Sequence, residues 1–182
     1  MTIKSEDGQG FMGLDMRSQY LGPALARNVT IQGFQYAMGI GQAFSSVAME
    51  HITLFKKSKA GFQFMQNIAW IRDLTRVNTV PVIVATGTSA LVVIAGNFSG
   101  GAGGNAAITF QSAGQVYLRN VNSAGCGSIG ARSRSVVVRG SAVAEYSSAA
   151  ADSAFPTPPQ ALMLRLRRRR SGATTISPTG PT

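Results

Sequence analysis

Residues Val116 to Val121 read VYLRNV, and this stretch belongs to a set of six short segments that share one pattern. The first and third positions are aliphatic or Ala, and the residues between them are mostly β-formers. Such period-2 alternation predicts a short strand with one buried face. The gapless set comprises VTIQGF from Val29, ITLFKK from Ile52, AWIRDL from Ala69, VVIAGN from Val92, VYLRNV from Val116 and VVVRGS from Val136.

The segments recur every 17 to 24 residues, and a second apolar stretch follows most of them. Repeats of this length, with Gly, Asn and Ser at the corners, are typical of a solenoid in which stacked coils share inward ladders. We therefore predict an all-β, right-handed parallel β-helix of about six coils. The sequence lacks the regular leucine pattern of a leucine-rich repeat. A β-sandwich would explain the alternation within each segment but not the aliphatic ladder at a steady spacing. The inward ladder is predicted at the third positions, Ile31, Leu54, Ile71, Ile94, Leu118 and Val138.

The same pattern predicts three regions. Residues 1–28 form an N-terminal partial coil and loop, residues 29–149 form the β-helix coils, and residues 150–182 form an irregular Pro/Arg-rich tail. No cap is evident at either end of the coils. Open strand edges at both ends therefore predict self-association.

Composition agrees with an all-β chain, since only 13% of residues are charged and 21 are Gly. The formal charge of +10 is concentrated in part in the run LRLRRRR, residues 164–170, which holds five of the 17 basic residues. An arginine run binds phosphates without sequence specificity. No aromatic residues interleave it and no nucleic-acid fold motif precedes it. A shifted reading frame or cloning read-through after Met163 explains the run better than an evolved nucleic-acid arm does.

Several classes of function have no signal in the sequence. The apolar stretches are too short to span a bilayer, so no membrane contact is predicted. Polar residues follow Met1, so no signal peptide is expected. The single cysteine, Cys126, excludes an intrachain disulfide. His51, the only histidine, lacks the neighbours that a metal site needs, and neither a metal nor another cofactor is predicted.

Several coil phrases together resemble bacterial right-handed β-helix proteins of the pectate-lyase-like, glycoside-hydrolase-related superfamily. These phrases are RNVTIQGFQYAMGIG, MEHITLFKKSKAGF, IRDLTRVNTVPVI, YLRNVNSAGCGSI and AFPTPPQAL. The resemblance implies a polysaccharide lyase or glycoside hydrolase with its site on an exposed sheet, and an extracellular or periplasmic parent protein. In that superfamily, carboxylates hold calcium or act in pairs. Here no two of the seven acids share an aligned slot, so we expect a C-terminal fragment without a complete active site and assign no catalytic residue.

Substrate-binding candidates lie on the predicted outer face. Arg72, Arg119 and Arg139 share the fourth position of the aligned segments, and such a stripe would suit uronate or sulfate groups. Trp70 and Tyr117 occupy the second position and could stack on sugars, and Asp73 follows a ladder strand. The predicted partner is an anionic polysaccharide. Two alternatives stay open: a structural or binding solenoid such as a surface or tail-fibre module, and a nucleic-acid binder acting through the arginine tail.

Overall fold

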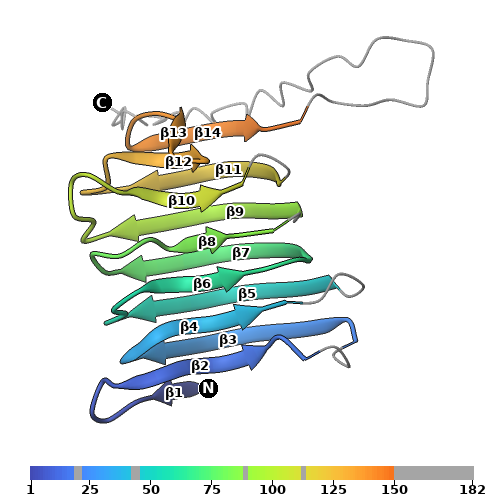
Figure 1. The fold of residues 1–182 in the computed structure, drawn as a ribbon, viewed down its shortest axis with the longest axis vertical. Helices are drawn as coiled ribbons and strands as arrows, with labels where there is room; N and C mark the ends of the chain where they lie inside the picture. Colours follow the sequence, from blue (N-terminus) through green and yellow to red (C-terminus); the bar gives the residue numbers. More distant parts are fainter. Residues whose placement is uncertain (19–21, 42–45, 88–89, 112–113, 150–182) are drawn as a thin grey trace, which may run out of the picture. The chain divides into compact units, whose positions relative to one another are not determined.

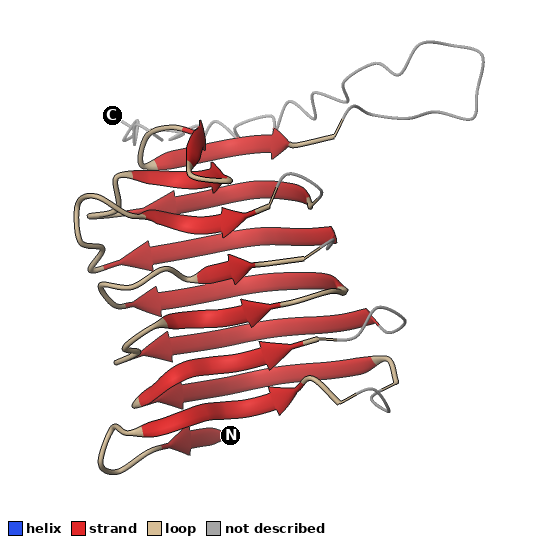
Figure 2. Ribbon diagram, in the orientation of Figure 1, coloured by secondary structure: helices blue, strands red, loops and turns tan. Residues whose placement is uncertain are grey.

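The computed structural model describes residues 1–18, 22–41, 46–87, 90–111 and 114–149, and in these residues the chain forms two seven-stranded sheets and no helix (Figures 1 and 2). Sheet A contains, in spatial order, β1 (Thr2–Lys4), β3 (Ala24–Gln32), β5 (Ser46–Phe55), β7 (Ile68–Val77), β9 (Ala90–Ser99), β11 (Gln115–Ser123) and β14 (Ala142–Ser147). Sheet B contains β2 (Gly10–Met16), β4 (Phe34–Ile40), β6 (Ala60–Phe64), β8 (Ile83–Ala85), β10 (Ala106–Phe110), β12 (Ser128–Arg132) and β13 (Ser135–Val138).

The chain alternates between the two sheets from β1 to β12, and each strand pairs in parallel with the strand two places later (Figure 1). This connectivity makes a parallel β-solenoid of about five turns, so the predicted fold class is confirmed. The sequence suggested about six coils. The difference arises because the sixth segment, from Val136, forms β13, which pairs antiparallel with β12 and does not start another turn.

The long strands of sheet A share a backbone feature that sets their register. One residue in each of the five sheet A strands β3, β5, β7, β9 and β11 has a positive φ between 51° and 59° although it is not glycine: Asn28, His51, Asp73, Ala95 and Asn120. The register skips this residue in every pair, because the residues before it and after it are matched directly. Each left-handed residue bends its strand and makes two consecutive residues face outward, which shifts the alternation by one.

This bend corrects part of the predicted ladder. Ile71 and Leu118 are buried before the bend, and both pair with Val93 of β9, which is 0% exposed. Ile94, expected in the core, is 36% exposed and points outward. The gapless alignment began this segment at Val92, whereas Leu91 is the residue that pairs with both Ala69 and Val116, so the segment was one residue out of register. Ile31 and Leu54 do pair with each other, after the bend, and both are fully buried.

The C-terminal end of the solenoid differs from the prediction of an open end. There β14 pairs antiparallel with β11, and β13 pairs antiparallel with β12. Val138 is buried, and Val143 and Tyr146 pack against the core. The antiparallel strands thus cover the last coil. The predicted irregular tail and its arginine run lie outside the described residues.

Candidate ligand-binding face

Two columns of side chains run across the outer face of sheet A before the bend. The aromatic column consists of Leu25, Ala48, Trp70, Val92, Tyr117 and Ser147. The charged column consists of Arg27, Glu50, Arg72, Ile94, Arg119 and Glu145. Members of the two columns on one strand are two residues apart, so they face the same side of the sheet.

Two strands of this face carry an aromatic residue together with an arginine. On β7, Trp70 is 46% exposed and the Arg72 side chain is 64% exposed. On β11, Tyr117 and Arg119 are half-buried. Both pairs lie in register, with one strand, β9, between them. Two strand spacings separate the pairs by about 10 Å, roughly the length of two residues of an extended sugar chain.

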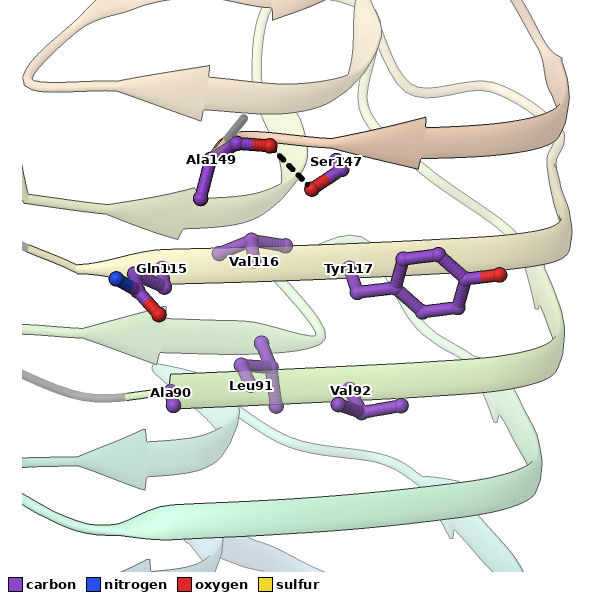
Figure 3. Close-up of a pocket in the computed structure, with 8 residues that line it drawn as sticks. All are labelled: Ala90, Leu91, Val92, Gln115, Val116, Tyr117, Ser147 and Ala149. Carbon is purple, nitrogen blue, oxygen red and sulfur yellow. Dashed lines mark hydrogen bonds between the residues drawn. The ribbon is translucent and has the colours of Figure 1, made fainter. Parts of the chain in front are cut away.

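Strand β9 carries Val92 and Ile94 at the positions that Trp70 and Arg72 occupy on β7, and a hollow lies near the start of β9 and β11. A cavity of about 120 Å³ opens beside Tyr117 and is lined on its outer side by Ala90, Val92, Gln115 and Ser147 (Figure 3). The Ser147 hydroxyl donates a hydrogen bond to the carbonyl oxygen of Ala149 at 2.8 Å, so its proton already has an acceptor within the protein. The hollow therefore offers mainly apolar contacts next to an aromatic ring.

Carboxylates accompany the arginines of this face. Arg27 Nε lies 3.3 Å from Glu50 Oε2, and Arg72 Nε lies 3.6 Å from Asp73 Oδ2. Asp73 also contacts His51 Nδ1 at 3.2 Å. Both are left-handed residues at the bend, and these residues form a column of their own, the bend column, beside the charged column. Three arginines therefore stand among three acids, so the positive potential expected from an arginine stripe is largely offset.

Tyr117 is held by β14, the antiparallel strand that covers the last coil. Its hydroxyl donates a hydrogen bond to Glu145 Oε1 at 2.7 Å. This hydrogen bond to a carboxylate is the main cause that raises the pKa of Tyr117 above its usual value. The ring is thereby fixed at the edge of the hollow, and Glu145 is placed in register with Arg119.

The structure brings together five of the six predicted binding residues. Trp70, Arg72 and Asp73 lie on β7, and Tyr117 and Arg119 lie on β11. Arg139 does not join them, because it follows β13 in sheet B and is exposed there. Its slot in the gapless alignment came from a segment that belongs to the cap.

Sequence reasoning missed two buried cations. Arg76 is 1% exposed and points into the core, in the column between Leu54 and Phe98. Its guanidinium donates to three carbonyl oxygens at 2.6–2.7 Å, those of Asn78, Val80 and Ser99, and contacts Cys126 Sγ at 3.5 Å. The signal for Arg76 is its position: it lies two residues after the buried Leu74, so its side chain faces the same inward side of the strand.

Lys57 is the second buried cation. It is 4% exposed, its Nζ has no hydrogen-bond partner, and the ammonium lies 5.4 Å from the centre of the Phe34 ring. Burial lowers the pKa of Lys57 to about 8, because the charged form loses its hydration. No run of lysines in a sequence shows which of its members is turned inward.

Two further structural findings concern the described residues only. They hold no group of three or more His, Cys, Asp or Glu side chains that could bind a metal ion. None of their segments is a helix long and apolar enough to cross a membrane.

Comparison with known proteins adds no relative: no family model, no curated protein and no solved structure matches this chain. The fold alone defines the class, a parallel β-solenoid. Membership of the pectate-lyase-like superfamily stays a prediction from the coil phrases.

Proposed function

We propose that this solenoid is a binding module for an extended polysaccharide, which lies on the outer face of sheet A and is not cleaved there. The observation that carries the proposal is the repetition of one aromatic–arginine pair on β7 and β11, in register on either side of β9, with an apolar hollow beside Tyr117. Trp70 and Tyr117 supply apolar ring faces, and Arg72 and Arg119 supply several N–H donors each. A sugar chain needs both kinds of contact.

The polysaccharide-active β-helix proteins that the coil phrases resemble support this assignment. The predicted anionic character of the ligand rests on Arg72, the most exposed arginine of the two pairs. Within the described part of the chain, it forms an ion pair only with Asp73, at 3.6 Å. Exposed arginines contribute under about 1 kcal/mol each, and neighbouring acids reduce this further. We therefore propose weak, millimolar binding in which the rings contribute more than the charges.

The experiment is an NMR titration of the full chain with oligogalacturonate and, in parallel, with a neutral glucan oligosaccharide of the same length. Shift changes should centre on β7, β9 and β11. Trp70→Ala and Tyr117→Ala should each remove most of the binding, and Arg72→Ala should weaken oligogalacturonate more than the neutral chain. The matched control is Asn122→Ala, since Asn122 is exposed on the same strand as Tyr117 but lies beyond the bend.

Two outcomes would contradict the proposal. Absence of shift changes with both oligosaccharides would leave a structural solenoid, the competing function. New reducing ends or unsaturated products would show an active site, and the module would then be an enzyme.

A further inference from the structure

The outer face of sheet A before the bend repeats over two coils and not over one. In the aromatic column a larger side chain alternates with a smaller one along successive strands: Leu25, Ala48, Trp70, Val92, Tyr117 and Ser147. In the charged column an arginine occurs on every second strand: Arg27, Glu50, Arg72, Ile94, Arg119 and Glu145. The two alternations are in phase, because β3, β7 and β11, which β5 and β9 separate in Figure 1, carry both the larger side chain and the arginine.

This alternation sets a distance between the cations. Neighbouring strands lie about 4.8 Å apart, so successive arginines of the charged column are about 10 Å apart, roughly the length of two residues of an extended sugar chain. The side chains of Arg27 and Arg72 are 59% and 64% exposed, and Arg119 is half-buried. A sugar chain that crosses the strands, with one sugar over each coil, therefore meets an arginine at every second sugar.

The positions between the arginines disfavour a second anionic group. Glu50 lies between Arg27 and Arg72 in register, and its Oε2 is 3.3 Å from Arg27 Nε. Ile94 lies between Arg72 and Arg119 and has no polar side-chain atom. A ligand carboxylate over Glu50 would be repelled, and one over Ile94 would lose water without gaining a partner. The face therefore discriminates against a chain that carries a charge on every sugar.

We propose that the ligand of this face is a polysaccharide in which an acidic sugar alternates with an uncharged one. The acidic sugars pair with Arg27, Arg72 and Arg119, and the uncharged sugars lie over β5 and β9. This inference rests on the proposed binding function and extends it in two respects. It adds β3 to the site, and it specifies the repeat of the ligand.

The test uses Trp70 as the reporter, because it is the single tryptophan of the chain and lies on this face. Its fluorescence is titrated in the full chain, at one ionic strength, with two hexasaccharides. In the hyaluronan hexasaccharide glucuronate alternates with uncharged N-acetylglucosamine, whereas in hexagalacturonate every sugar carries a carboxylate. The hyaluronan hexasaccharide should bind at least about threefold more tightly, although non-specific attraction to a basic chain favours the more highly charged ligand.

Three variants test the arrangement of charges. Ile94→Arg adds a cation between Arg72 and Arg119 and should shift the ratio of the two dissociation constants toward hexagalacturonate by about threefold. The matched control is Asn97→Arg, which adds the same charge to the same strand beyond the bend and should leave the ratio unchanged. Arg27→Ala should weaken binding of the hyaluronan hexasaccharide about threefold, because one acidic sugar loses its partner.

The outcomes separate this inference from the binding function on which it rests. Equal or tighter binding of hexagalacturonate by the wild type, an unchanged ratio in Ile94→Arg, or unchanged affinity in Arg27→Ala would overturn the alternating repeat while leaving a polysaccharide-binding face. A Trp70 signal that responds to neither hexasaccharide would overturn both. Ile94 and Asn97 are exposed, so their substitutions should leave the fold intact, and circular dichroism melting of each variant checks this.

Discussion

Val93 and Ile94 are neighbours in β9, yet Val93 is fully buried in the core and Ile94 faces outward between Arg72 and Arg119. Val93→Asp should therefore lower the free energy of unfolding by about 3 kcal/mol or more, because it buries an unpaired carboxylate. Ile94→Asp should cost less than about 1 kcal/mol, since it places the carboxylate at the surface beside two arginines. Urea denaturation of the two variants measures the difference. Equal destabilisation would mean that β9 is shifted by one residue.

Ala95 occupies the bend column with φ 59°, a conformation that disfavours residues with a Cβ. Ala95→Gly should raise the free energy of unfolding by about 1 kcal/mol, since glycine adopts this conformation without strain. Ala48→Gly is the control, because Ala48 is extended and partly buried in the same sheet. It should be destabilising by about 0.5–1 kcal/mol. Thermal melting that shows both changes with the same sign would contradict the bend.

The burial of Lys57 predicts a dependence of stability on alkaline pH. Its pKa falls from 10.5 to about 8 on folding, so between these values the unfolded chain binds more protons than the folded chain. The free energy of unfolding should therefore rise as pH increases from about 8 to 10.5, and the full cost of burying the charge remains below pH 8. Lys57→Met should stabilise the protein at pH 7 by about 1–2 kcal/mol and abolish this rise.

The control for Lys57 is Lys59→Met, since Lys59 is exposed and only lies 5.9 Å from the centre of the Tyr36 ring. Denaturation curves at several pH values should show the alkaline rise in the wild type and in this control. A rise that persists in Lys57→Met would assign it to another group.

Arg76 joins two successive coils, because its guanidinium donates to the carbonyl oxygens of Asn78 and Val80 after β7 and of Ser99 at the end of β9. Arg76→Met keeps most of the buried volume but removes all three of these hydrogen bonds, and among the described residues only the Ser99 carbonyl oxygen keeps another donor, the backbone N–H of Asn78. We expect a loss of about 2–4 kcal/mol in the free energy of unfolding. Arg72→Met, on the exposed side of the same strand, should stay within about 0.5 kcal/mol. If both variants unfold alike in urea, Arg76 does not hold the turns.

The sequence by itself determined the solenoid. Aliphatic residues such as Ile31 and Leu54 recur at the length of one coil, and only stacking lets every such residue face inward. It also placed Trp70 and Tyr117 on the outer face, because their parity relative to Ile71 and Leu118 is local to one strand. Information within a strand is sufficient for such assignments.

Only the tertiary structure decided what depends on pairing between strands. The left-handed residue in each bend has no fixed identity, being Ala95 in one coil and Asp73 in another, so composition does not reveal where the alternation shifts by one. The antiparallel pairing of β13 and β14 also has no local signal, since Val136 has the same pattern as a parallel strand. Direction and register are set by the neighbouring strand and by the burial that pairing achieves.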